Sequence, residues 1–207
     1  MLYAIYMKFI VGLGNPEEQY IGTRHNVGRD FLRTFAKKNK FEDFEYDKKV
    51  NAQISVGEIG IGKKKEKVTL ILPDTYMNKS GASLKKFITS AKKAESMLVI
   101  YDELDMGIGS TKIAFNKSNA GHKGIDSVIR AVKTKAFAKM KVGISATTPT
   151  GKIKKPKGEE KVVKHVLGKF SPKEQPVIKK IEKHVCGAIE EFVLNGHISA
   201  MNGFNHK

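Results

Sequence analysis

The chain has little cysteine and no long apolar run. Its single cysteine, Cys186, excludes an internal disulfide framework, and the helical pattern around it predicts a small, buried core residue. No segment is long enough to cross a bilayer, and the apolar start lacks the basic flank of a secretory signal. We therefore expect a cytoplasmic protein that does not insert into membranes.

Acidic residues are also few, since 21 Asp and Glu stand against 38 Lys and Arg, for a formal net charge of +17. An excess of this size favours a polyanionic partner, most simply nucleic acid. An anionic membrane is less favoured, because no segment resembles a basic amphipathic anchor. The plainer interpretation, a well-hydrated lysine-rich surface, stays open. With 40% hydrophobic residues, the chain can still build a folded core.

Several catalytic signatures are missing. There is no G-x-S-x-G nucleophile elbow, and the six histidines are scattered without the spacing of metal ligands. The stretch Gly12–Gly14 is an incomplete dinucleotide fingerprint, because Glu17 occupies the position of the third glycine. We expect neither a metal nor a cofactor. Elimination leaves a water molecule, activated by a base, that attacks a carbonyl group.

Apolar segments alternate between the periods of strands and helices. Strands are predicted over residues 3–11, 52–59, 67–72, 97–101, 110–115 and 139–144, and helices over 27–40, 80–93, 124–133 and 172–195. The alternation indicates an α/β fold: one domain over residues 1–207, with a twisted mixed central sheet flanked by helices and with a C-terminal helix. Ser80 and Ser171 are expected to cap two of the helices and Gly196 to end the last one. A flexible polar loop is expected near 146–160.

Polar side chains follow four of the predicted strands. The stretches concerned are Gly12–Asn26, Tyr76–Gly81, Asp102–Asp105 and Asn119–Gly124. In open α/β sheets the ligand crevice lies outside the carboxyl ends of the strands. We therefore expect these loops to converge on one site that offers an imidazole, a carboxylate and several amides.

Within these loops, His25 is the candidate general base, because an imidazole accepts a proton near neutral pH. Asp102 could bind the far ring nitrogen and stabilise the imidazolium. Asn15 and Asn78 supply amides that both donate and accept hydrogen bonds. Each residue also has a plainer interpretation: a solvated loop histidine, a turn-capping aspartate, and asparagines that serve only the backbone of a turn.

The motifs resemble those of bacterial peptidyl-tRNA hydrolases over nearly the whole chain, from about residue 8 to the end. Those that carry the resemblance are Gly12-Leu13-Gly14-Asn15-Pro16, Tyr20, Thr23-Arg24-His25-Asn26-Val27-Gly28, Tyr76-Met77-Asn78-Lys79-Ser80-Gly81, Asp102-Glu103-Leu104-Asp105, Gly121-His122-Lys123-Gly124, Val166-Leu167-Gly168-Lys169-Phe170 and Ala200-Met201-Asn202.

The resemblance implies metal-independent hydrolysis of the ester between a peptide and the 3′-terminal ribose of tRNA. It implies that His25 is the base and Asp102 its supporting carboxylate. Asn15, Tyr20, Tyr76, Met77, Asn78 and the position of Lys123 would contact the substrate. The expected partner is the acceptor stem and 3′ end of peptidyl-tRNA, bound by a monomer in the cytoplasm that recycles tRNA in translation.

One loop departs from the family. Lys123 stands where an asparagine is usual, and the preceding run, usually glycine-rich, is Asn116–Ala120. Either the Lys123 ammonium grips the substrate, or it points to solvent and Asn116 or Asn119 supplies the missing amide. Because of Lys123, a second interpretation stays open, a non-catalytic RNA-binding protein on the same fold. Such a protein, however, has no need of both His25 and Asp102. A general esterase is disfavoured by the basic charge.

Overall fold

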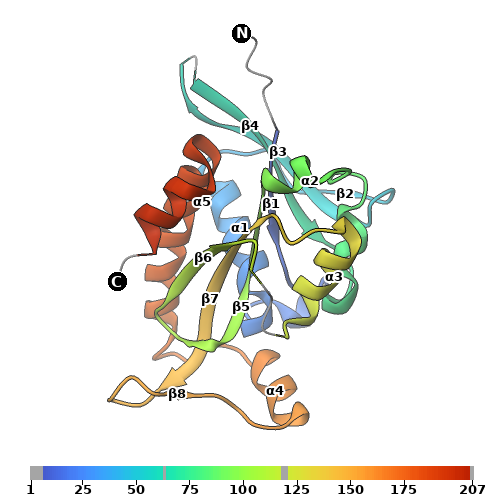
Figure 1. Cartoon of the computed structure of the whole chain (residues 1–207). Coiled ribbons are helices and arrows are strands. Elements are labelled where there is room, and N and C mark those ends of the chain that lie inside the picture. Colours follow the sequence, from blue (N-terminus) through green and yellow to red (C-terminus); the bar gives the residue numbers. More distant parts are fainter. Residues whose placement is uncertain (1–6, 63, 118–120, 206–207) are drawn as a thin grey trace.

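The computed structural model describes residues 7–62, 64–117 and 121–205, and eight strands in these ranges form one sheet (Figure 1). The strands are β1 (Lys8–Gly12), β2 (Glu45–Asp47), β3 (Ala52–Ile61), β4 (Lys64–Pro73), β5 (Met97–Gly107), β6 (Thr111–Phe115), β7 (Ala138–Thr147) and β8 (Ile153–Lys154). Their order is β2-β3-β4-β1-β5-β7-β6, and β8 pairs with the end of β7.

The centre of the sheet is parallel and its edges are antiparallel. β1 runs parallel to β4 and β5, and β5 runs parallel to β7. β2, β3, β6 and β8 are antiparallel to their neighbours. The carboxyl ends of β1, β4, β5 and β7 therefore meet at one end of the sheet, where a ligand crevice is expected.

Helices cover both faces of the sheet. They are α1 (Val27–Lys38), α2 (Ala91–Glu95), α3 (Lys123–Val132), α4 (Glu159–Val166) and α5 (Gln175–Phe204), with 3₁₀ turns η1 (Glu18–Tyr20), η2 (Arg24–Asn26) and η3 (Met77–Leu84). α1 and α5 pack on one face, and η3, α2 and α3 pack on the other. The two apolar clusters under these layers hold the sheet in place.

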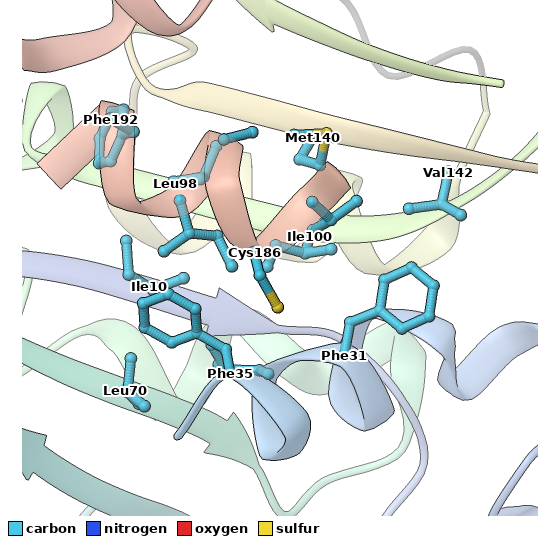
Figure 2. Packing of buried hydrophobic residues seen from close by; sticks show 14 of the residues in the cluster. Ile10, Phe31, Phe35, Leu70, Leu98, Ile100, Met140, Val142, Cys186 and Phe192 are labelled. Atoms are coloured by element: carbon cyan, nitrogen blue, oxygen red, sulfur yellow. The ribbon is translucent and has the colours of Figure 1, made fainter. Parts of the chain in front are cut away.

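The cluster beneath α1 and α5 is built from large apolar side chains (Figure 2). Phe31 and Phe35 of α1 lie four residues apart and face the same way, as the helical period requires. Cys186 projects from α5 into this layer and is buried, and burial raises the pKa of its thiol to about 11. Cys186 is therefore the inert core residue that the sequence predicts.

Gly28 allows α1 to lie directly against β5. A Cβ atom built at Gly28 would lie 2.2 Å from the carbonyl oxygen of Ile100, and one at Gly12 would lie 2.6 Å from the carbonyl oxygen of Gly28. Only glycine fits at these approaches. The close packing sets the start of α1, and with it His25, beside the middle of β5.

The fold class and most elements agree with the sequence prediction. The mixed sheet, the flanking helices and the C-terminal helix are confirmed. The hairpin of β3 and β4 is longer than expected, since its strands pair from Ala52–Pro73 to Ile61–Lys64. The first predicted strand begins at Lys8, and the part of it over residues 3–6 lies outside the described residues.

The predicted helix over residues 80–93 is wrong. Ser80 is buried inside η3, where its hydroxyl donates to the carbonyl of Met77 rather than capping a helix. The helix of this region is the short α2, and its cap is Ser90, whose Oγ accepts from the Lys93 N–H at 3.2 Å. Tertiary burial of Ser80 overrode the local capping pattern.

The last helix begins later than predicted, and it is interrupted at the predicted residue, Gly196. The N–H of Ser171 binds the Glu174 carboxylate, and α5 starts at Gln175. Gly196, with φ of 84° and ψ of 179°, is not helical and separates two helical segments, so the first segment stops there as predicted and a second one continues to Phe204. The segment beyond the bend packs on β6: the ring of His197 stacks on Phe115, and the side-chain amide of Asn205 binds the backbone of Ile113. These contacts hold the second helical segment, which the sequence analysis did not predict, against the sheet.

The segment 146–160 is not a structureless loop. It contains the end of β7, the short strand β8 and the first residues of α4.

Within the ranges that the structure covers, no helix combines the length and hydrophobicity that a membrane crossing requires.

Candidate active site

His25 lies in η2, in the connection between β1 and α1. This connection is held by a reciprocal pair of amides. The N–H of Asn15 donates to Oδ1 of Asn26 at 2.9 Å, and Nδ2 of Asn26 donates to the carbonyl of Asn15 at 2.9 Å. Because Asn26 is fully buried, the pair fixes the path of the loop and the place of the neighbouring imidazole.

Asp102 lies near the middle of β5 with 2% of its surface exposed. Its Oδ1 lies 2.8 Å from Nδ1 of His25 and 3.0 Å from Nε2 of His122. One buried carboxylate oxygen therefore serves two imidazoles. The predicted pairing of His25 with Asp102 is present, and His122 is a third member that the sequence analysis did not single out.

The hydrogen bonds fix the protonation pattern of the two rings. Nδ1 of His122 accepts from the N–H groups of Gly124 and Ile125, at 3.2 and 3.3 Å, at the start of α3. His122 therefore carries its proton on Nε2 and donates it to Asp102. His25 in turn donates its Nδ1–H to Asp102, which leaves Nε2 of His25 as the basic atom.

The electrostatics of the pair suit a general base. Burial lowers the pKa of His25, and so does the charge of Lys123, but the Asp102 carboxylate outweighs both and the pKa is raised above its usual value. Burial raises the pKa of Asp102, but the two imidazoles and their hydrogen bonds hold that pKa net well below its usual range. Asp102 therefore stays an anion at neutral pH and favours the imidazolium form of His25.

A cavity of about 240 Å³ opens beside these three residues. It has a polar floor, an apolar wall from α4 and Leu104, and a charged rim formed by Lys123, Lys155 and Glu159. The wall is built by Val162, Val163 and Val166, which lie on one side of α4. A cleft of this kind, with a few polar groups against an apolar wall, is typical of small-ligand sites.

Asn15 ties a second loop to the base. Its Oδ1 accepts from the N–H of Met77 at 3.0 Å, at the start of η3. Within the described part of the chain, Nδ2 of Asn15 makes no hydrogen bond, so it is available as a donor. Met77 is buried against the start of α3, since a Cβ at Gly124 would meet its sulfur at 2.4 Å.

The other predicted contact residues lie farther out. Tyr76 is exposed, and its hydroxyl donates to Glu17 at 2.6 Å. Tyr20 is half-buried and Asn78 is exposed. None of these three residues, nor Asn15 or Met77, lines the described cavity around His25, so the predicted site residues fall into two adjoining groups.

Lys123 is the first residue of α3, and 69% of its side chain is exposed. Its Nζ lies 3.2 Å from Oε1 of Glu159 on α4, across the rim of the cavity. Asn116 lies beyond β6 in a left-handed conformation, with φ of 52°. Asn119, the other residue considered as a source of the missing amide, lies outside the described residues.

Distances within the catalytic group also bear on metal binding. The ligand atoms of His25, Asp102 and His122 lie within 4.8 Å of one another. The sequence argument against a metal rested on spacing along the chain, and it did not foresee this proximity. In the structure the two ring nitrogens bind the carboxylate through their protons, and a metal ion would have to displace both protons.

Comparison with known proteins adds to this geometry. The model of the peptidyl-tRNA hydrolase family matches residues 9–207. The chain belongs to the peptidyl-tRNA hydrolase family. It is 36% identical to a peptidyl-tRNA hydrolase of Halalkalibacterium halodurans over 200 residues, which cover 96% of this chain and all of the relative. It is 38% identical to one of Clostridium perfringens over 201 residues, 96% and 97% of the two chains.

Solved structures of the family share the fold. A crystal structure of peptidyl-tRNA hydrolase from Acinetobacter baumannii superimposes with a TM-score of 0.81 at 30% identity, over 99% of this chain and 97% of that one. A complex of peptidyl-tRNA hydrolase with N-propanol gives a TM-score of 0.82 at 31% identity, with the same coverage. The resemblance stated from the motifs alone is thus confirmed over the length of the chain.

Proposed function

We propose that this chain hydrolyses the ester bond of peptidyl-tRNA with His25 as the general base. The observation that carries the proposal is the buried Asp102 carboxylate, which orients His25 and leaves its Nε2 free beside an open cavity. An ester needs less activation than an amide, so one base and one water molecule suffice for the attack.

In the proposed reaction, Nε2 of His25 takes a proton from water as the water oxygen attacks the ester carbonyl carbon. The bond between that carbon and the ribose 3′ oxygen then breaks. The proton moves from His25 to the ribose oxygen, and free peptide and tRNA result. Asp102 stabilises the imidazolium between the two proton transfers. Asn15 Nδ2, Tyr20, Tyr76, Met77 and Asn78 are proposed to bind the end of the substrate.

The decisive assay measures release of tRNA from N-acetyl-aminoacyl-tRNA, beside unblocked aminoacyl-tRNA. Rapid release from the blocked substrate and slow release from the unblocked one are expected. Tight binding of tRNA without turnover would overturn the proposal in favour of a non-catalytic RNA-binding protein. Turnover of small esters at a comparable rate would instead point to a general esterase.

We further propose that the partner surface for the acceptor stem lies beside α4, and that the protein acts as a monomer. Exposed lysines cluster in residues 152–164, next to the cavity rim. Of the other lysine-rich stretch, residues 63–67, the described part over 64–67 begins β4 at the tip of the β3–β4 hairpin, which projects from the opposite end of the sheet (Figure 1). Of the two stretches, only the first is close enough to serve the cavity.

Binding of tRNA is expected to weaken steeply with salt. Each neutralised phosphate contributes about 0.9 for a B-form duplex, and about 0.7 for a single strand, to the steepness of the fall of log K with log salt concentration. Replacing both Lys154 and Lys157 with alanine is expected to make the salt dependence weaker, reducing the magnitude of this slope by about 1 to 2. The matched double variant Lys64→Ala, Lys67→Ala removes the same charge from the hairpin and is expected to leave the slope unchanged. Fluorescence anisotropy with labelled tRNA measures both, and equal effects would contradict the proposed surface.

Lys123 is proposed to leave Glu159 and to donate to the substrate. Lys123→Ala is then expected to lower kcat/KM roughly ten-fold, the loss of one charged hydrogen bond, and Lys123→Asn to recover much of it. Because the Lys123 charge lowers the pKa of His25, its removal is expected to move the acid limb of the pH–rate profile to higher pH.

Glu159→Gln is the control for this prediction, since it removes the partner of Lys123 without removing the ammonium. It is expected to keep full turnover. If Lys123→Ala turns over like the parent and Asn116→Ala or Asn119→Ala does not, the compensating asparagine is the substrate contact.

A further inference from the structure

The residue before the base, Arg24, is buried and bound to a distant segment. It is 9% exposed, and its Nη2 lies 3.0 and 2.8 Å from the two carboxylate oxygens of Glu174, which is 150 positions away along the chain. Its Nη1 donates to the carbonyl of Lys169, and its guanidinium lies 4.8 Å from the centre of the Phe170 ring. One face and both terminal nitrogens of the guanidinium are thus engaged in fixed contacts.

The backbone makes the same connection. The N–H of Arg24 donates to the carbonyl of Gly168 at 3.0 Å, and Thr23 forms an isolated antiparallel bridge with Lys169. The turn η2, which carries His25, is therefore attached to segment 168–174 through both main chain and side chain. This segment joins α4 to α5.

Glu174 is itself held firmly. It lies directly before α5, and its carboxylate also accepts from the N–H of Ser171 at 2.7 Å. Burial alone raises the pKa of Glu174, but the Ser171 and Arg24 contacts lower it net, so the carboxylate is an anion. α5 packs with α1 in the core and is therefore held in place. Through Glu174, which directly precedes α5, the position of η2 is fixed relative to that helix.

Stability alone does not account for this arrangement. A buried ion pair often contributes less than apolar residues of the same size, because both charges must leave water. The Nε atom of Arg24 is buried and has no hydrogen-bond partner among the described residues, which is a further cost. What a guanidinium bound through both of its terminal nitrogens, to Glu174 and to the Lys169 carbonyl, supplies is geometric restraint.

That restraint bears directly on the base. Among the described residues, the side chain of His25 makes its hydrogen bond to Asp102 on β5. The orientation of the imidazole therefore depends on where η2 is held relative to β5. Segment 168–174 also follows α4, whose valines form the apolar wall of the cavity. One contact thus fixes the base and the end of the wall against each other.

We propose that Arg24 and Glu174 are positioning residues that hold His25 in register with Asp102 and with the α4 wall. They touch neither water nor substrate in the reaction and act through His25, so the inference rests on the proposed role of that histidine. Loss of the contact between Arg24 and Glu174 lets η2 shift. Misplacement of a catalytic group by about 1 Å can cost as much as about a hundred-fold in rate.

The test compares Glu174→Gln and Arg24→Lys with Glu190→Gln in the full chain. Glu190 lies on the same helix and pairs with Lys38 at an exposed site, so it controls for the loss of an α5 carboxylate. On N-acetyl-aminoacyl-tRNA, the first two variants are expected to lower kcat ten-fold or more with KM within two-fold. The control is expected to keep the kcat of the parent.

The titration of His25 supplies a readout that does not need activity. In protein carrying ¹³C-labelled histidine, with the His25 signal assigned by its loss in His25→Ala, Glu174→Gln is expected to lower the pKa of His25 because the contact to Asp102 loosens. The acid limb of the pH–rate profile should follow. Normal kcat and an unshifted His25 titration in both folded variants would overturn the proposal, even if their melting temperatures fall.

Arg24→Lys keeps the positive charge and loses the fork, so it tests the proposal if Glu174→Gln does not fold. A parent chain that binds tRNA without hydrolysing it would refute the proposed function. In that case the His25 titration alone would still decide whether Arg24 and Glu174 position the imidazole.

Discussion

Replacing His25 with alanine is expected to lower kcat on N-acetyl-aminoacyl-tRNA by roughly 10²–10⁴-fold, the usual contribution of a general base. Nε2 of His25 is the basic atom that Asp102 leaves free, and no other imidazole nitrogen of the described cavity has that freedom, since both nitrogens of His122 are engaged. Quench-flow or steady-state release of tRNA measures the loss.

Binding of tRNA by His25→Ala is expected to stay within about two-fold of the parent, because the substitution removes no charge from the lysine-rich surface. His197→Ala is a matched control, since this histidine stacks on Phe115 far from the cavity and is expected to leave kcat unchanged. Near-normal turnover in a folded His25→Ala protein would mean that another group activates the water.

Replacing Asp102 with asparagine is expected to cost less than His25→Ala but still at least ten-fold in kcat. The asparagine oxygen can still accept from both rings, as Oδ1 does, but the neutral amide cannot stabilise an imidazolium as the carboxylate does. The Asp102 charge is what raises the pKa of His25 against burial and Lys123. Without that charge the pKa of His25 falls.

The sign of the pH effect follows from this. The base works when deprotonated, so a lower pKa of His25 moves the acid limb of the kcat/KM profile to lower pH. Asp105→Asn makes the same substitution three positions along, at an exposed ion pair with Lys155, and is expected to leave that limb in place. An acid limb that stays in place in Asp102→Asn would contradict the assigned pairing.

The sequence determined the parts of this protein that depend on neighbouring residues. The apolar run at residues 97–101 gave the central strand, and the helical period after Val27 gave α1. The motif around His25 and the D-E-L-D stretch identified the family and, through it, the base and its carboxylate. These features are local, so a short window of sequence contains them.

Only the tertiary structure brought in His122. Its predicted loop follows β6. This strand is antiparallel to β7, so it ends where β5 and β7 begin, at the end of the sheet away from their carboxyl ends. Even so, His122 returns to Asp102 at the start of α3. The one local signal was a histidine directly before a predicted helix, where its ring nitrogen can cap the first N–H groups.

The same limit separates the remaining successes and errors. Ser80 carries a local signal for a helix cap, and its burial within η3 overrode that signal, whereas the stop signal at Gly196 is confirmed by its non-helical backbone. The pairs that hold the base join residues 77 positions apart in the case of His25 and Asp102, and 150 apart in the case of Arg24 and Glu174. Sequence periodicity specifies which face of an element is buried. Which distant residues then meet is decided by strand order and by the packing of α1 and α5, because those set where each loop leaves the sheet.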